Sequence, residues 1–343
     1  MDELSHRLRT FVDRLVAEEP VSAASVLVGS ADRVEGEAFA GRFRSASPAE
    51  PDRQTLFDLA SLTKPFMASL ALLLEEQGLC SLEQTIGDIW PHASRPLAHK
   101  TLADLLRHGA GFQAWAPLYH LCEQPEEVEE LLLGGRLLAG EPDVYSDLDF
   151  ILWGLAAETC LGRPLADLAV SHLAPLVGAG TLVVEPGPDD PVAECLLDTS
   201  REVDLAAGQG IDLALRRGPE VGVPQDGNAR FLGGLGGHAG LFATARAVWD
   251  LAREWLRPRV LAADAVEKAL SGPGPFLLGW RRPRKDGRDG EALGPESFGH
   301  IGFTGGSVWI DRGPGRIYVL LAHRTVVAAD LEPWRRELHE LAF

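Results

Sequence analysis

A serine and a lysine lie three residues apart at the start of a strongly apolar segment. Ser61 and Lys64 belong to FDLASLTKPFMASLALLL, residues 57–74. Positions i and i+3 of a helix share one face about a turn apart, so the amine can reach the hydroxyl. If burial lowers its pKa, such an amine can accept the hydroxyl proton and make the serine a nucleophile. A capping serine beside a lysine that extends to solvent is the alternative, and this spacing alone is a weak signal.

Two other segments contain residue types that suit the same chemistry. In EPDVYSDLDF, Tyr145 precedes Ser146 and Asp147. A tyrosine can transfer protons when cations lower its pKa, whereas Ser146 or Asp147 could instead be a helix cap. In FGHIGFTGGSVWID, His300 precedes Gly302, and glycine lets a ligand or a second backbone approach closely. The alternative there is an edge strand with bulges and an exposed histidine.

A glycine-rich segment, GNARFLGGLGGHAGLFATA at 227–245, has the composition of a phosphate-binding loop. No lysine follows the glycines as a P-loop requires, and no strand is clearly indicated before them. We therefore reject nucleotide binding at this segment. His238 precedes an apolar stretch, and we interpret it as a structural residue.

Composition and charge narrow the classes of protein. The 343 residues are 45% hydrophobic and 24% charged, which is ordinary for a folded chain of about two lobes. A formal net charge of −18 argues against nucleic acid and against anionic membranes as partners. The N-terminus lacks the apolar core of a signal peptide and no run of about 20 apolar residues occurs, so a cytoplasmic protein is expected. The four cysteines match no zinc or redox motif, so we expect reduced thiols and neither a metal nor a cofactor: Cys80, Cys122, Cys160 and Cys195.

Hydrophobic patterns predict strands at both ends of the chain and helices between them. The expected elements are two strands in 24–41, a helix over 61–77, helices within 81–180, irregular structure over 181–235, a helix from 238, a loop over 281–299, a hairpin within 302–324 and a terminal helix from 332. This order favours an α+β fold, with an antiparallel sheet from both chain ends flanked by helices and an inserted all-helical lobe. The expected organisation is one catalytic domain over 1–343, with a sheet lobe at about 1–60 and 240–343 and a helical lobe at about 61–239. A site is expected in the cleft between the lobes.

Taken together, the three segments resemble a known family. Ser61-Leu62-Thr63-Lys64, Tyr145-Ser146-Asp147 and His300-Ile301-Gly302 look like the three motifs of the serine β-lactamase and penicillin-binding superfamily. The likeness is closest to its class C-related branch, which includes β-lactamase-like esterases, D-amino peptidases and transesterases. It spans most of the chain, including ADLLRHGAGF, GGHAGLFATA and the final hairpin.

The resemblance implies a mechanism and a set of site residues. Ser61 would be the acylated nucleophile, and Lys64 and Tyr145 would share its proton and pass it to the leaving group. The oxyanion would lie between the backbone amides of Ser61 and Phe303. The same resemblance places His300 among the catalytic residues. It places Asp147, Ile301, Gly302 and Phe303 among those that bind substrate.

Departures from the family pattern bear on the substrate. Asp147 stands where the family often has asparagine, and the only asparagine, Asn228, is far away in sequence. His300 and Ile301 stand where lysine and threonine are common, which removes a full charge and a hydroxyl that help to hold a carboxylate. We therefore expect a serine hydrolase that acts on a small ester or amide through an acyl-enzyme on Ser61. The alternatives are a β-lactamase or D,D-peptidase proper, and a non-catalytic binding protein on the same scaffold.

Overall fold

Both ends of the chain contribute to one antiparallel sheet. The computed structural model describes residues 3–45, 49–140, 143–178, 180–284, 286–324 and 329–341. Five strands pair in the order β2-β1-β10-β9-β8, and every pair is antiparallel. Their bounds are β1 (Val21–Ser30), β2 (Val34–Gly41), β8 (Phe298–Ile301), β9 (Ser307–Asp311) and β10 (Arg316–Arg324). The predicted fold class and the predicted hairpin are confirmed.

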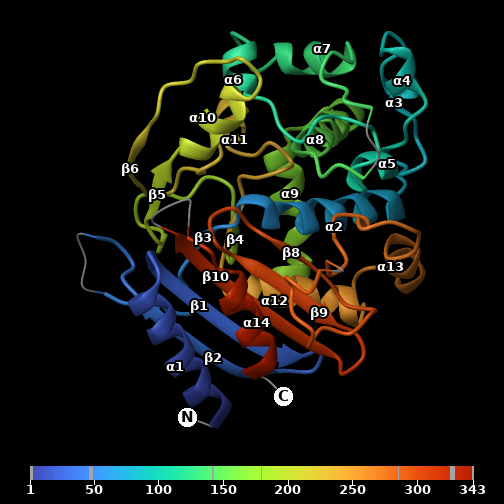
Figure 1. The fold of residues 1–343 in the computed structure, drawn as a ribbon. Helices are drawn as coiled ribbons and strands as arrows, with labels where there is room; N and C mark the ends of the chain where they lie inside the picture. The colour runs from blue at the N-terminus through green and yellow to red at the C-terminus, as the bar shows by residue number, and fades with distance from the viewer. Residues whose placement is uncertain are drawn as a thin grey trace.

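Helices cover both faces of this sheet (Figure 1). The N-terminal helix α1 (Glu3–Glu18) and the C-terminal helix α14 (Glu332–Leu341) lie on one face, and α12 (Ala245–Leu256) lies on the other. Successive side chains of a strand point to opposite faces, so β1 is buried on both. Val26 and Val28 pack in the cluster with α1 and α14, whereas Leu27 packs in the main core.

The central helix α2 (Thr63–Glu76) lies between the sheet and the helical lobe (Figure 1). Its first twelve residues are all buried, as expected for a helix that is apolar on every side. Residues of α2 share the main core with α8 (Asp147–Leu161) and α9 (Leu165–Val177). This burial fixes the start of α2 between the sheet and the helices α8 and α9.

Shorter elements complete the fold. They are the 3-10 turn η1 (Ala60–Leu62), α3 (Ile86–Ile89), α4 (Arg95–Ala98), α5 (Leu102–Leu106), α6 (Leu118–Leu121), α7 (Glu127–Leu133), α10 (Ser200–Ala207), α11 (Gly227–Phe231) and α13 (Ala263–Ala269). The short strands are β3 (Phe57–Asp58), β4 (Leu182–Val183), β5 (Cys195–Asp198), β6 (Arg217–Glu220) and β7 (Phe242–Ala243). Residues beyond 341 of the predicted terminal helix lie outside the described residues.

Three element predictions require correction. The helix expected over 61–77 begins as η1 and becomes α-helical only at Thr63. The segment 181–235 contains β4, β5, α10, β6 and α11, because its strand pairs join distant residues and leave no local pattern. The helix expected from His238 begins at Ala245, since Gly240 has φ +116° and cannot be helical.

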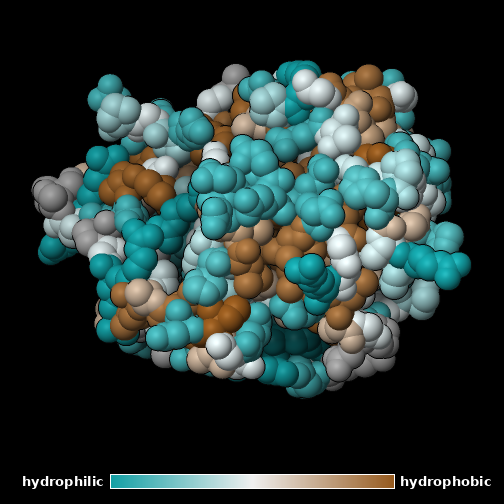
Figure 2. All heavy atoms as spheres, turned by 90° about the horizontal axis from the view of Figure 1, so that it is seen from above, coloured by the Kyte–Doolittle hydropathy of each residue, from teal (hydrophilic) through white to brown (hydrophobic). Residues whose placement is uncertain are grey.

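Figure 2 shows the surface of the molecule that lies at the top of Figure 1, and the hydropathy of this surface is mixed. Hydrophilic side chains cover much of this face, and hydrophobic ones form separate patches among them. None of the helices in the described ranges is long and apolar enough to cross a membrane. No group of three or more potential metal ligands gathers among the described residues.

Candidate active site

Ser61 lies in a strained turn between β3 and α2. Ala60, just before it, has φ +45°, a conformation that costs a non-glycine residue about 1–2 kcal/mol. The buried Asp58 carboxylate holds this turn, accepting from the Ala60 amide at 2.9 Å and from the Gln225 amide at 2.7 Å. The turn thus presents Ser61 at the N-terminal end of α2, where the helix dipole favours negative charge.

Lys64 is completely buried one turn after Ser61. Its Nζ lies 3.1 Å from Ser61 Oγ, 2.6 Å from Asp147 Oδ1 and 3.1 Å from the backbone oxygen of His238. The three N–H groups of an ammonium therefore have three acceptors. The predicted contact between the serine and the lysine is present in the structure.

Asp147 reaches Lys64 because α8 begins at this point. The Ser146 hydroxyl accepts from the Leu148 amide at 3.2 Å and donates to the Gln113 carbonyl at 2.7 Å, which makes Ser146 the N-cap. The capping alternative is thus correct for Ser146. The neighbouring Asp147 side chain instead pairs with Lys64 across the cleft.

Tyr145 lies over the same amine. Its ring centroid is 4.9 Å from Lys64 Nζ, and both Lys64 and Ser61 act to lower the pKa of its hydroxyl. The His108 ring packs 4.4 Å from the Tyr145 ring, and His108 Nδ1 accepts from the Ser146 amide at 3.0 Å. Burial lowers the pKa of His108 to about 3, so this histidine is neutral support for the tyrosine.

A lowered pKa was the condition under which the Lys64 amine could accept the serine proton at rest. Burial by itself lowers the pKa of Lys64, but the Asp147 charge and then Tyr145 outweigh it, so the pKa is raised. The resting amine is therefore a protonated partner of Asp147 and not a free base. Burial also raises the pKa of Tyr145, although Lys64 opposes this effect. Deprotonation of the Lys64–Tyr145 pair consequently requires a rise in pH or a change on substrate binding.

The third segment approaches Ser61 from the sheet. His300 lies in β8, is 2% exposed, and its Nδ1 lies 3.0 Å from the Ile301 carbonyl. The alternative of an exposed histidine at this position is therefore wrong. Burial, together with Lys64 and Arg281, holds the pKa of His300 well below its usual range, so the ring is neutral.

The residues after His300 form the turn between β8 and β9. A Cβ on Gly302 would lie 2.6 Å from the Leu59 carbonyl oxygen, so only glycine permits the close approach of this turn to the Ser61 turn. Within the described ranges, the amides of Ser61 and Phe303 donate to no other backbone group. Both amides are thus available to a ligand oxygen.

Two cavities meet at Ser61. The charged residues that line the one of about 260 Å³ are mainly acidic, and those that line the other, of about 620 Å³, are mainly arginines. The acidic residues of the first are Asp147, Asp198, Glu202 and Asp226, and the arginines of the second are Arg201, Arg281, Arg284, Arg288, Arg324 and Arg335. Ser61, Tyr145, Asp147, Arg201 and Phe303 line both cavities, which therefore form one continuous cleft.

Sequence reasoning missed part of this site. Asp226 and Arg201 line the cleft, and the backbone of His238 contacts Lys64. The only sequence signal near these residues was the segment GNARFLGGLGGHAGLFATA. Its glycines suggested a phosphate-binding loop, and we rejected nucleotide binding there. Asn228 does not replace the missing family asparagine, because its side chain binds the backbone of Ala116 and Leu118.

Known proteins are similar to this chain over most of its length. It is 25% identical over 308 residues to an Escherichia coli (strain K12) protein provisionally named a D-alanyl-D-alanine carboxypeptidase, covering 81% of this chain and 71% of that protein. It is also 25% identical over 294 residues to the N-acetylmuramyl-L-alanine amidase of Bacillus subtilis (strain 168), and this match covers 77% of this chain and 67% of that protein. These names belong to the relatives.

Solved structures share the fold. EstCE1, described as a hydrolase with promiscuous acyltransferase activity, superimposes with a TM-score of 0.77 at 18% identity, covering 98% of each chain. A class C β-lactamase from Rhodobacter sphaeroides superimposes with a TM-score of 0.75 at 19% identity, covering 99% of each chain. A family model described as Beta-lactamase matches residues 8–343, from the first core helix to the last residue. Since this match covers nearly the whole sequence, the chain belongs to the β-lactamase family, whose members are serine hydrolases of the β-lactamase and penicillin-binding type.

Proposed function

We propose that this protein is a serine hydrolase that forms an acyl-enzyme on Ser61. The observation that carries the proposal is the 3.1 Å contact between Ser61 Oγ and Lys64 Nζ at the junction of the two cavities. Ser61 Oγ attacks the substrate carbonyl, and its proton passes to the Lys64–Tyr145 pair and then to the leaving group. Water later cleaves the acyl ester and regenerates Ser61.

The amides of Ser61 and Phe303 stabilise the oxyanion in this scheme. Both lie at the cleft, and neither donates to another backbone group of the described chain. Removal of one such donor typically costs about 10²–10³ in rate. Because Asp147 keeps the resting Lys64 protonated, we expect acylation to accelerate as pH rises.

The substrate class that we propose is a small, neutral ester or amide. A neutral His300 and an apolar Ile301 supply no cation and no hydroxyl next to Gly302, where a carboxylate would otherwise be held. One observation favours the second candidate, a D,D-peptidase or β-lactamase that recognises a carboxylate. It is the arginine-lined cavity beside Ser61, which supports an anionic group on the substrate.

Intact mass spectrometry and ester turnover test the proposal. A fluorophosphonate should add one adduct to the wild type and none to Ser61→Ala, and Ser61→Ala should lose at least ~10³-fold in hydrolysis of a neutral p-nitrophenyl ester. Ser171→Ala is the matched control, because Ser171 lies on α9 and its hydroxyl contacts Asp167 and Leu168 carbonyls. Full activity of Ser61→Ala in a clean preparation would overturn the proposal, and a wild type with neither adduct nor turnover would favour a binding protein.

A further inference from the structure

The glycine-rich segment 233–241 is attached to the Ser61 turn on both sides. The Leu59 amide donates to the Leu241 carbonyl at 2.9 Å, and the Leu241 amide donates to Thr63 Oγ1 at 3.3 Å. Lys64 Nζ donates to the carbonyl of His238 at 3.1 Å. These bonds bracket Ser61, so the position of the segment and the position of the Lys64 amine are coupled.

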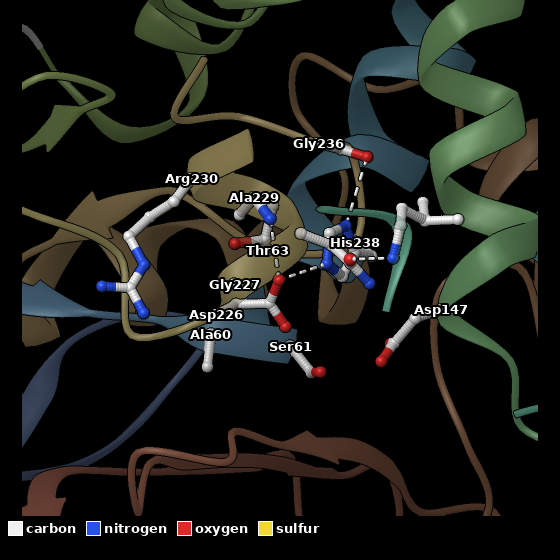
Figure 3. A network of polar contacts seen from close by, with 12 residues as sticks. Ala60, Ser61, Thr63, Asp147, Asp226, Gly227, Ala229, Arg230, Gly236 and His238 are labelled. Carbon is white, nitrogen blue, oxygen red and sulfur yellow. Dashed lines mark hydrogen bonds and ion pairs between the residues drawn. The ribbon is translucent and has the colours of Figure 1, made fainter. Parts of the chain in front are cut away.

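A buried ion pair holds this segment in place (Figure 3). His238 Nε2 lies 2.8 Å from Asp226 Oδ1, and His238 Nδ1 lies 3.3 Å from the Gly236 carbonyl. Asp226 Oδ1 also accepts from the Ala229 amide at 2.8 Å. A carbonyl oxygen and an ionised carboxylate can only accept hydrogen bonds. With Asp226 ionised, both ring nitrogens of His238 therefore face acceptors. Each nitrogen then carries a proton, and the ring is a cation.

We propose that His238 and Asp226 are positioning residues for Lys64. Their ion pair orients the His238 carbonyl toward the amine, and the imidazolium charge opposes the charge of the Lys64 ammonium. The inference rests on the proposed function, in which Lys64 shares the proton of Ser61. The proposal gives the glycine-rich segment a role in placing the Lys64 amine. The three motifs by themselves assign this segment no role.

Charged and titratable groups surround the buried Lys64 amine. Asp147 and Tyr145 favour its protonated form, whereas His238 opposes that form and Asp226 compensates His238. His108 and His300 also face the amine, and burial keeps both rings neutral. Loss of either member of the His238–Asp226 pair would leave a net charge close to the amine.

The direction of the titration follows from the same contacts. Burial by itself lowers the pKa of His238, but Asp226 outweighs it and the pKa is raised. Burial opposes ionisation of Asp226 as well, yet the His238 charge and hydrogen bond lower the pKa of Asp226 to about 2. Both shifts favour the ionised form, so the two opposite charges of the pair cancel each other.

The decisive variant is His238→Gln, which keeps an amide donor for Asp226 but has no charge. Asp226 is then uncompensated and favours protonated Lys64. We expect the acid limb of kcat/KM for the neutral p-nitrophenyl ester to move up by about 1 pH unit, with the plateau at high pH little changed. The double variant His238→Gln with Asp226→Asn removes both charges, and its acid limb should return to the wild-type position.

A merely structural role predicts a different result. A distorted segment would lower the rate by the same factor at every pH, and such a profile in a folded His238→Gln would overturn the proposal. A double variant with the same shifted limb would also overturn it. His172→Gln is the control, because His172 lies on α9 and its Nδ1 is within hydrogen-bond distance of the Ser171 hydroxyl and the Leu168 carbonyl. Ser61→Ala tests the proposed function separately, since its outcome does not depend on His238.

A measurement on the wild type keeps the proposal testable if His238→Gln does not fold. In protein labelled with ¹⁵N at histidine, both ring nitrogens of one histidine should keep protonated shifts above the ordinary histidine pKa. A titration in which no histidine stays doubly protonated above that ordinary value would overturn the proposal.

Discussion

At the scale of single residues, we propose that Lys64 and Tyr145 act as one proton-transfer unit. Lys64 Nζ contacts Ser61 Oγ at 3.1 Å, and the Tyr145 ring centroid lies 4.9 Å from the same amine. We expect Lys64→Ala and Tyr145→Phe each to lower kcat/KM for the neutral ester by at least ~10²-fold. The double variant should lose little more, because residues that act as a unit are not additive.

The double-mutant cycle itself provides the check for this prediction. All four proteins are compared at one pH on the plateau, with thermal melts to confirm folding. Losses that multiply in the double variant would mean that Lys64 and Tyr145 have independent roles, and the shared proton would be abandoned.

We propose that His300 and Ile301 govern the choice between neutral and carboxylate substrates. The double change His300→Lys with Ile301→Thr adds a charge and a hydroxyl next to Gly302. A charge-assisted hydrogen bond is worth about 1.5–3 kcal/mol, so penicillin acylation of Ser61 should rise by roughly tenfold or more, with little change for the neutral ester. The measurement is the second-order acylation rate for both substrates.

Two outcomes would contradict the role of this pair. An unchanged penicillin rate in a well-folded double variant would mean that discrimination lies elsewhere, with Arg201 the next residue to test because it lines both cavities. A wild type that already reacts rapidly with penicillin would favour the carboxylate-recognising candidate.

At the scale of elements, the start of α8 combines a cap with a buried carboxyl. Asp149 is 0% exposed, accepts from the Ala110 amide at 3.0 Å through Oδ1, and its Oδ2 has no partner in the described chain. Negative charge is favoured in the first turn of a helix, but burial outweighs this and raises the pKa of Asp149 to about 8. The carboxyl is therefore mainly protonated in the folded protein at pH 7.

This raised pKa makes stability depend on pH. The unfolded carboxyl ionises near pH 4 and the folded one near 8, so Asp149 lowers the free energy of unfolding progressively as pH rises between those values. Asp149→Asn removes the titration and keeps the shape. We expect its gain in melting temperature over the wild type to grow from pH 4 to pH 8 and then level off. A difference that is constant across this range would mean that Asp149 is ionised in the fold.

At the scale of the whole molecule, the two chain ends stabilise the sheet together. Phe11 of α1 packs edge-on against Trp334 of α14 with ring centroids 5.7 Å apart, and Trp334 Nε1 donates to Glu19 at 3.0 Å. Trp334 is 6% exposed, so Trp334→Ala leaves a cavity between the two helices. We expect it to lower the free energy of unfolding by about 3–5 kcal/mol.

Urea unfolding measures this loss. Val170→Ala is the control, because Val170 is 48% exposed on α9 and its truncation should change stability by less than about 0.5 kcal/mol. A loss below about 1 kcal/mol for Trp334→Ala would show that the terminal helices are not part of the cooperative core.

The sequence alone predicted the features that depend on local spacing. Ser61 and Lys64 meet because three residues make about one helical turn, and the hairpin of β9 and β10 follows from alternating apolar residues around a tight turn. The motifs also indicated the family and the α+β fold, since their order and separations reflect a whole chain. The division into lobes and the catalytic roles remain predictions.

Only the tertiary structure decided the electrostatics of the site. Lys64 is paired with a carboxylate 83 residues later and with a carbonyl 174 residues later, and these partners set its charge. The Asp226–His238 pair and the arginine-lined cavity likewise arise from segments that are distant in sequence. The physical reason is that a pKa depends on burial and on distances between charges, which long-range packing sets and no local pattern contains.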